Sequence, residues 1–186
     1  MHPVLRIFVA AIALITSTLA QAADRPQVVF ETTMGKFTIE LYDDKAPITV
    51  ANFLRYVDEG FYEGTIFHRI IRRFVVQGGG FDRNMVKKET HDPIINESQY
   101  GLYNDRFTLS MARTEDPNSA TSQFFINLRM NTKLDKRQGK DGYAVFGEVI
   151  IGQEVVHEMG FVNTRTFAGM DDVPVTPVTV LKAYRK

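Results

Sequence analysis

The sequence contains no cysteine and no tryptophan, and only four of its 186 residues are histidine. The absence of cysteine excludes disulfide bonds, and it also excludes a lipid-modified cysteine at a processed N-terminus. The histidines, at 2, 68, 91 and 157, are scattered without the spacing of metal ligands. Basic and acidic side chains number 22 each, so the charge balance gives no reason to expect nucleic acid or an acidic membrane surface as a partner.

Two common catalytic signatures are also missing. The glycines at 78–80 are followed by Phe81-Asp82-Arg83, whereas a phosphate-binding loop of the Walker type ends in Gly-Lys-Ser/Thr. The serines at 110, 119 and 122 sit in no Gly-x-Ser-x-Gly elbow, so a serine hydrolase has no support.

The N-terminal segment differs in character from the rest of the chain. Arg6 precedes an apolar run at 7–15, and small residues at 20 and 22 occupy the positions that a signal peptidase reads. This pattern predicts a cleaved secretory signal at 1–22, followed by one domain at 23–186. An uncleaved membrane anchor is the alternative, but the apolar run is shorter than the roughly 20 residues that span a bilayer.

The remaining sequence is typical of one globular domain, with 44% hydrophobic and 24% charged residues overall. Alternating apolar residues predict a β-hairpin over 28–41, and apolar residues at 50, 53, 54 and 57 predict a helix over 46–60. Further elements are expected as strands at 70–71, 75–76, 107–112, 122–128, 143–149 and 178–184, a helix at 153–159 and an irregular loop at 82–105. Eight strands joined mostly by short turns indicate an antiparallel barrel or sandwich, and periodicity does not decide between them.

The stretch FHRIIRRFVVQGGGF at 67–81 predicts a pair of strands that carry polar residues where apolar residues are usual. Two apolar runs flank Arg72-Arg73, which predicts a hairpin with an exposed turn, and each arm carries a polar residue, Arg69 or Gln77. Buried polar groups need partners or a ligand. Two interpretations stay open from the residues alone. Arg69 and Gln77 either bind a substrate, or they are a carboxylate-paired arginine at the end of a barrel and a satisfied core amide.

Three blocks of sequence together resemble one family. FHRIIRRFVVQGGGF, LSMARTEDPNSATSQFF at 109–125 and YAVFGEV at 143–149 closely resemble the cyclophilin-type peptidyl-prolyl cis-trans isomerases, in the same order. The resemblance extends over about 28–180, and the loops are similar to those of the bacterial exported branch. It implies a mainly β fold, a closed eight-stranded antiparallel β-barrel capped by two α-helices.

The resemblance also implies an activity and a site. The expected activity is peptidyl-prolyl cis-trans isomerisation during the folding of exported proteins, and it needs no cofactor or metal. The signal-like segment predicts a bacterial periplasm as the compartment, and the polar surface without a cofactor site predicts a monomer. Arg69 is similar to the family's catalytic arginine. The expected substrate-binding residues are Phe74, Val75, Phe125 and Leu134 around the proline ring, Gln77 and the backbone of Ala112 and Arg113 along the peptide, and Tyr143 where histidine is common. Phe125 also has a purely structural interpretation, as a residue of a barrel strand.

Some positions depart from the commonest pattern of the family. Arg72-Arg73 replaces a frequent Pro-Gly turn, Val75 replaces methionine, and Arg113 replaces an asparagine that acts through its backbone. Lys133 stands where many members carry a tryptophan that contacts cyclosporin, and we therefore expect weak cyclosporin binding. The alternative to an enzyme is a non-catalytic module or holding chaperone that docks proline-containing peptides, for which a donor to the amide nitrogen is not needed.

Overall fold

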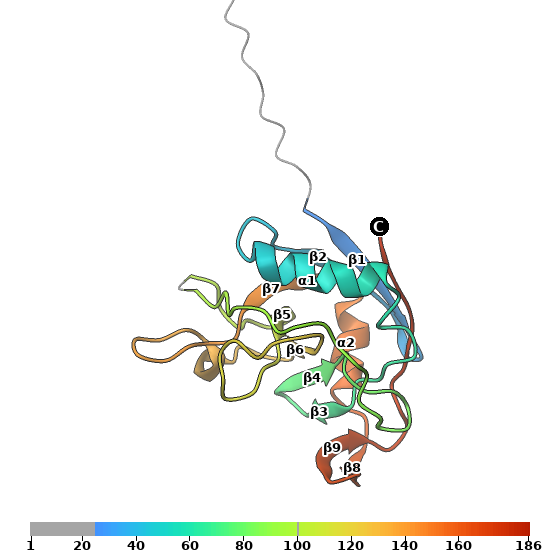
Figure 1. Ribbon diagram of the computed structural model, residues 1–186. Coiled ribbons are helices and arrows are strands. Elements are labelled where there is room, and N and C mark those ends of the chain that lie inside the picture. Colours follow the sequence, from blue (N-terminus) through green and yellow to red (C-terminus); the bar gives the residue numbers. More distant parts are fainter. Residues whose placement is uncertain (1–24, 100) are drawn as a thin grey trace, which may run out of the picture.

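The computed structural model describes residues 25–99 and 101–186, so the predicted signal at 1–22 lies outside the described residues. The described chain forms ten strands, two α-helices and one short 3-10 helix, η1 (Thr132–Leu134) (Figure 1). The helices are α1 (Pro47–Asp58) and α2 (Gln153–Met159). The strands are β1 (Gln27–Thr32), β2 (Gly35–Leu41), β3 (Arg69–Ile71), β4 (Val75–Gly78), β5 (Thr108–Met111), β6 (Phe124–Asn127), β7 (Val145–Ile151), β8 (Thr164–Phe167), β9 (Met170–Pro174) and β10 (Val180–Arg185).

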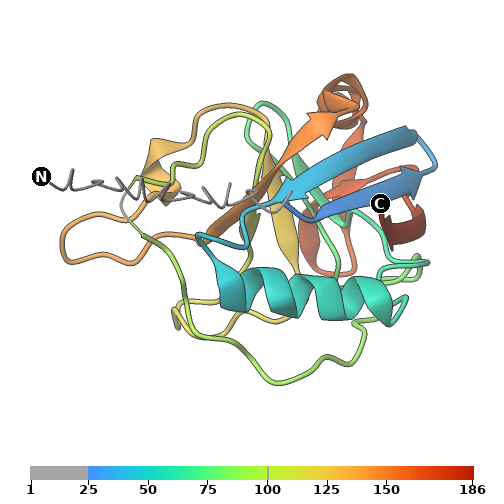
Figure 2. The ribbon, with the colours of Figure 1, turned by 90° about the horizontal axis from the view of Figure 1, so that it is seen from above.

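Eight of these strands form one strongly curled sheet, in the order β10-β1-β2-β7-β5-β6-β4-β3. Every pair in it is antiparallel, which confirms the predicted pairing. The segments just before the two outermost strands approach each other, where Phe67 donates its N–H to the Val178 carbonyl at 2.9 Å and Val180 donates to the Thr65 carbonyl at 2.8 Å. Figure 2 shows α1 and α2 on opposite sides of the curled sheet. The mainly β architecture with two helices is as predicted.

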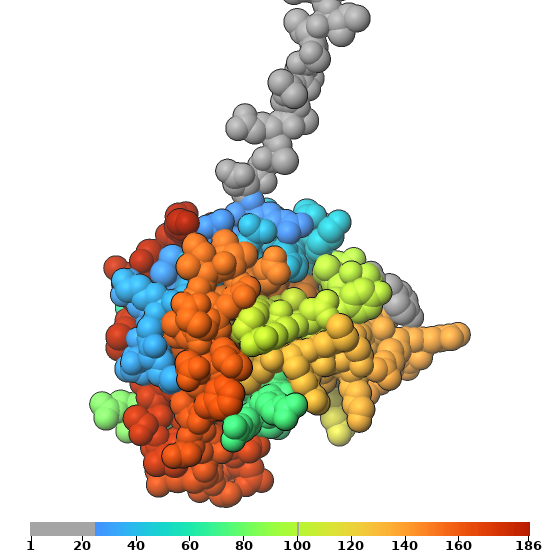
Figure 3. Space-filling model, turned by 180° about the vertical axis from the view of Figure 1, so that it is seen from behind, coloured from blue at the N-terminus to red at the C-terminus, as the bar shows by residue number. Residues whose placement is uncertain are grey.

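The helix α1 follows directly from its sequence. Pro47 occupies the first turn, where its missing N–H costs no hydrogen bond, and the apolar residues Val50, Phe53, Leu54 and Val57 are all buried. The shorter helix α2 packs beside β2 and is seen in orange on the face shown in Figure 3. No helix among the described residues is long and apolar enough to span a membrane.

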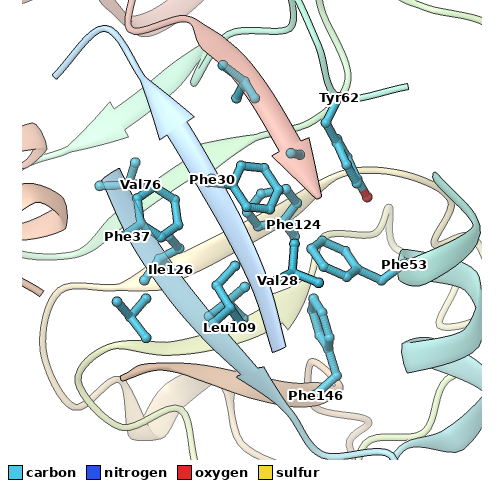
Figure 4. Close-up of a cluster of buried hydrophobic side chains, with 14 of the residues drawn as sticks. Val28, Phe30, Phe37, Phe53, Tyr62, Val76, Leu109, Phe124, Ile126 and Phe146 are labelled. Carbon is cyan, nitrogen blue, oxygen red and sulfur yellow. The ribbon is translucent and has the colours of Figure 1, made fainter. Parts of the chain in front are cut away.

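Aromatic side chains from both the sheet and α1 fill the core (Figure 4). The ring of Phe53 on α1 lies 5.1 Å from that of Phe146 on β7 and 5.5 Å from that of Phe124 on β6, measured between centroids. Phe30 on β1 stacks on Phe37 on β2 at 5.4 Å. The core therefore joins α1 to strands from across the sheet.

One part of the fold was not predicted. β8 and β9 form a separate two-stranded sheet between α2 and β10. The sequence predicts no regular element between the helix at 153–159 and the strand at 178–184, whereas Asp171 and Asp172 belong to β9. All four residues of β8 are exposed, so its sequence shows no alternation of buried and exposed positions.

Candidate functional site

The hairpin of β3 and β4 places Arg69 directly opposite Gln77. The Arg69 guanidinium donates from Nη1 to Gln77 Oε1 at 3.3 Å, and Gln77 Nε2 donates to Gln123 Oε1 at 3.1 Å. No carboxylate forms an ion pair with Arg69 in the described part of the chain. The structure therefore disfavours a carboxylate-paired arginine, and it shows that the Gln77 amide is satisfied by two side chains.

Arg69 and Gln77 open onto a hollow of about 500 Å³, here called the Arg69 hollow. Its lining combines residues of the β3–β4 hairpin with Gln123 and with the first residues of β9. The lining residues are His68, Arg69, Gln77, Phe81, Gln123, Met170, Asp171 and Asp172. The unpredicted β9 thus forms one wall of this hollow and brings two carboxylates to it.

Two glycines allow the close packing around this hollow. Gly79 has φ +82°, and a Cβ there would lie 2.9 Å from the Ser122 carbonyl oxygen. A Cβ on Gly80 would lie 2.5 Å from Cγ of Gln123, which is the residue that holds Gln77. The glycine run thus lets the backbone approach the segment that leads into β6, and it keeps space for the Gln77–Gln123 pair.

A second hollow, of about 890 Å³, lies beside Tyr143 and is here called the Tyr143 hollow. Four of the predicted binding residues line it, together with Lys133 at the position of the family tryptophan. The lining residues are Phe74, Arg113, Thr114, Glu115, Lys133, Leu134, Lys140, Asp141 and Tyr143. It therefore combines apolar surface from three side chains with several charged groups.

Phe125 lines neither hollow, but it has a neighbour in each, Gln77 in the Arg69 hollow and Tyr143 in the Tyr143 hollow. It pairs with Gln77 across β4 and β6, and its ring meets that of Tyr143 edge-on at 5.4 Å between centroids. Only 5% of Phe125 and 3% of Val75 are exposed, so both are packed by the protein itself, although neither belongs to the main core cluster. The structural and the ligand-binding interpretations of Phe125 are therefore compatible.

The Arg113 side chain packs on the Tyr143 ring and donates hydrogen bonds to nearby backbone carbonyls. Its guanidinium carbon lies 4.6 Å from the centre of the Tyr143 ring, and Nη2 donates to the Asp141 carbonyl at 3.0 Å. The Ala112 N–H donates to the Gln123 carbonyl at 2.9 Å. A peptide held by the backbone here would therefore use the Ala112 carbonyl and the Arg113 N–H.

His68 precedes Arg69 and is 3% exposed. Burial, assisted by the neighbouring Arg69 guanidinium, lowers the pKa of His68 to about 4. Its Nδ1 has no hydrogen-bond partner among the described residues. At neutral pH the ring is uncharged, so it adds no second cation beside Arg69.

Gln123 is the residue of this site that the sequence reasoning missed. It belongs to the Ser-Gln-Phe-Phe motif but received no role of its own. It stands two residues before Phe125, and side chains two residues apart on a strand share a face, so the period of a strand could have identified it. The arrangement as a whole places a charged N–H donor, Arg69, next to Gln77, which in turn pairs with the apolar residue Phe125 on the neighbouring strand. Among the residues that line the two hollows, no nucleophile is hydrogen-bonded to a general base.

The chain matches the family model "Cyclophilin type peptidyl-prolyl cis-trans isomerase/CLD" over residues 27–185. The peptidyl-prolyl cis-trans isomerase of Acinetobacter baylyi is 48% identical over 167 residues, which cover 90% of this chain and 89% of that protein. Peptidyl-prolyl cis-trans isomerase B of Escherichia coli is 49% identical over 157 residues, covering 82% of this chain and 95% of that protein.

Solved structures give the same result. A crystal structure of a cyclophilin-type isomerase from Cryptosporidium parvum has a TM-score of 0.73 at 25% identity, covering 87% of this chain and 98% of that one. The structure of the same protein in the presence of the dipeptide Ala-Pro has a TM-score of 0.72 at 26% identity, covering 86% and 98%. Together with the family match, these similarities show that the chain belongs to the cyclophilin-type peptidyl-prolyl cis-trans isomerase family.

Proposed function

We propose that this chain, a peptidyl-prolyl cis-trans isomerase by family, uses Arg69 to accelerate rotation about X-Pro bonds of exported proteins as they fold. The observation that carries the role of Arg69 is its hydrogen bond to Gln77 beside Phe125, with no carboxylate paired to it among the described residues. Gln77 lies between Arg69 and Phe125 in the sheet, so the charged N–H groups are held two strands from the apolar ring beside which a substrate amide would lie.

The reaction needs little chemistry from the protein. Conjugation keeps a prolyl amide planar behind a barrier of ~18–20 kcal/mol, and a rate of about a thousand turnovers per second requires lowering it by roughly 7 kcal/mol. As the C–N bond rotates, the prolyl nitrogen loses conjugation and regains a lone pair. An N–H of Arg69 directed at that lone pair binds the twisted amide better than the planar one.

Arg69 supplies only part of this stabilisation. A charged hydrogen bond contributes about 1.5–3 kcal/mol, so the rest comes from holding the ring in desolvated surroundings. We place the proline ring on Phe74, Phe125 and Leu134, with Val75 beneath. Gln77, the backbone at 112–113 and the Tyr143 side chain hold the flanking peptide.

The localisation and the finer fold belong to the same proposal. The signal-like segment at 1–22 supports cleavage and export to a bacterial periplasm, and mass spectrometry of the secreted chain would locate the new N-terminus. The hydrogen bonds between 64–67 and 178–180 support a closed barrel. In a closed barrel these amides exchange with solvent as slowly as those of β1, whereas fast exchange would indicate an open sheet.

Weak cyclosporin binding is a further part of the proposal, because Lys133 places a flexible ammonium group in the Tyr143 hollow. Replacing Lys133 with tryptophan restores a large apolar contact, which we expect to tighten cyclosporin binding by about tenfold. Titration calorimetry of the wild type, Lys133→Trp and Lys133→Ala measures this. Submicromolar binding by the wild type would contradict the proposal.

The decisive experiment compares the wild type with Arg69→Ala on an Ala-Pro peptide by exchange NMR. Uncatalysed isomerisation takes tens of seconds, so acceleration is easily resolved. We expect the variant to lose at least about tenfold in rate, which corresponds to one charged hydrogen bond in the transition state. Arg165→Ala, an exposed arginine on β8, is the matched control and retains the wild-type rate.

Peptide affinity measured on the same proteins separates the two interpretations. An enzyme loses rate in Arg69→Ala while its peptide affinity changes little, because Arg69 acts on the transition state. If the wild type binds the peptide without accelerating its exchange, the chain is a binding module and the catalytic role of Arg69 is wrong.

A further inference from the structure

A third hollow, of about 470 Å³, lies at the turn of the β3–β4 hairpin and contains an unusual concentration of positive charge. We call it the basic hollow. It is lined by Arg72, Arg73, Arg106, Leu128, Arg129, His157, Gly160 and Phe161. Figure 3 shows this face, with the hairpin turn in green, the loop before β5 in lime and α2 in orange. Segments far apart in the sequence thus bring four arginines together.

The four arginines are exposed, and within the described residues none of them forms an ion pair with a carboxylate. The sequence as a whole has equal numbers of basic and acidic side chains, so this concentration is local. Like charges held close together repel one another unless a counter-charge is present. The planar guanidinium group matches carboxylate and phosphate groups in a fork-like geometry. The hollow is therefore suited to an anionic ligand.

The backbone of the turn gives a second indication that these side chains are required. Arg73 has φ +56°, a conformation that glycine adopts freely and that arginine adopts only at some cost. A turn optimised for stability alone would place glycine at this position. An arginine there supports a role for the side chain itself.

The aromatic residue of the basic hollow already has partners. The guanidinium carbon of Arg72 lies 4.9 Å from the centre of the Phe161 ring, and the His157 ring meets Phe161 edge-on at 4.9 Å. Arg106 Nη2 lies 3.3 Å from His157 Nδ1, so a neutral His157 accepts this hydrogen bond. Proteins that bind single-stranded nucleic acid without sequence preference use free aromatic faces as stacking platforms along a charged groove. Here the arginines surround a single ring, Phe161, which is already in contact with Arg72 and His157. The basic hollow is therefore better suited to carboxylate groups than to stacked bases.

The basic hollow adjoins the site described above. Arg73 precedes Phe74, which lines the Tyr143 hollow. Arg129 donates from Nε to Asn131 Oδ1 at 3.1 Å, and Asn131 Nδ2 donates to the Phe74 carbonyl at 3.0 Å. A polypeptide that reaches Phe74 thus comes within a few residues of the arginines.

We propose that the basic hollow binds an acidic segment of the polypeptide substrate, separately from the proline-containing segment. Aspartate and glutamate side chains of that segment pair with Arg72, Arg73, Arg106 and Arg129. The assignment to a substrate rests on the proposed isomerase function, whereas binding of an acidic peptide can be tested without it.

The first test is titration calorimetry with a blocked hexapeptide of alternating aspartate and glutamate, which contains no proline. We expect saturable binding at low salt that weakens as salt is added, and none for the asparagine and glutamine version. Arg72→Glu and Arg106→Glu should each weaken binding by about fivefold or more, because an attraction becomes a repulsion. Lys182→Glu on β10 changes the net charge equally and stays within about twofold of the wild type, because it lies outside the hollow and exposed charges are screened by salt.

Three results would overturn the proposal. These are absence of saturable binding by the wild type, equal weakening by Lys182→Glu, and tighter binding of a single-stranded oligonucleotide than of the peptide at the same salt. Arg69→Ala should bind the hexapeptide as the wild type does, so loss of isomerisation and loss of this site are separate observations.

The second test links the acidic hexapeptide to Ala-Pro through a flexible glycine-serine spacer. Two segments on one chain raise each other's local concentration, so kcat/KM for isomerisation should exceed that for the neutral version. Arg72→Glu should remove this advantage while leaving the rate on the neutral peptide unchanged. If the linked peptide gains nothing although the hexapeptide binds, the assignment to substrate is wrong. If neither peptide is isomerised, the isomerase proposal fails, and the hexapeptide titration still decides whether the hollow binds acidic peptides.

Discussion

At the scale of single residues, His68 connects the site to the pH dependence of stability. Its pKa in the folded chain is about 4, below the ordinary value of 6.5, mainly because of burial. Above pH 6.5 the histidine is neutral in both the folded and the unfolded chain. As the pH is lowered from 6.5 to 4, only the unfolded chain takes up the proton. The free energy of unfolding therefore decreases as the pH decreases through this window.

We expect this loss to reach about 3 kcal/mol near pH 4, at about 1.4 kcal/mol per pH unit. Urea unfolding of the wild type and His68→Gln across this range measures it, with the plateau between pH 7 and 8 as the internal reference. The variant lacks the ionisable group, so its stability should fall less steeply. Parallel curves for the two proteins would show that His68 does not remain neutral in the fold.

Single residues also show how far the sequence reasoning could reach. Arg69 and Gln77 face each other because a tight turn between two short strands fixes their register, and this could be predicted locally. The hydrogen bond from the Arg113 guanidinium to the Asp141 carbonyl could not be predicted in this way. It joins residues 28 positions apart through a loop without periodicity. Contacts of this kind depend on how the whole chain closes.

At the scale of elements, α1 depends on a residue far from it in the sequence. Ala46, at the N-cap position, makes no capping hydrogen bond through its side chain. The Glu97 carboxylate instead accepts from the Ile48 N–H at 3.1 Å and from the Thr49 N–H and hydroxyl at 2.6 Å each. A negative charge at a helix N-terminus is favourable, so Glu97 fastens the irregular segment at 82–105 to α1.

Replacing Glu97 with alanine should lower the free energy of unfolding by about 1–2 kcal/mol, the usual cost of losing a helix N-cap. Glu97→Gln keeps the oxygen acceptor without the charge and should cost less. Glu89→Ala is the matched control, because Glu89 is exposed in the same segment and makes no side-chain hydrogen bond among the described residues. Equal losses for the Glu89 and Glu97 variants in urea unfolding would rule out the capping role.

Elements differed in how predictable they were, for a physical reason. The apolar residues of α1 recur with the helical period and are buried together, so the sequence reveals the helix. β8 has no buried face, and its sequence therefore lacks the alternation of apolar and polar residues that identifies a half-buried strand. β9, which pairs with β8, was not predicted either. Its residues line the Arg69 hollow, so the expected site lacked this wall.

At the scale of the whole molecule, the aromatic core makes the sheet and α1 depend on each other. Phe53 is fully buried, and its ring lies 5.3 Å from that of Tyr62 and 6.1 Å from that of Phe30, in addition to its contacts with Phe124 and Phe146. Such a shared cluster predicts that the described domain unfolds as one cooperative unit rather than in parts.

Phe53→Ala tests this cooperativity. Removing the ring leaves a cavity between α1 and the sheet, and we expect the free energy of unfolding to fall by about 3–5 kcal/mol. The denaturant m-value should stay unchanged, because the same surface is exposed when one unit unfolds. Phe167→Ala, an aromatic residue on β8 that is 43% exposed, is the matched control and should change stability by less than about 0.5 kcal/mol. A small loss for Phe53→Ala with a reduced m-value would mean that α1 detaches while the sheet stays folded, and the core would then not be shared.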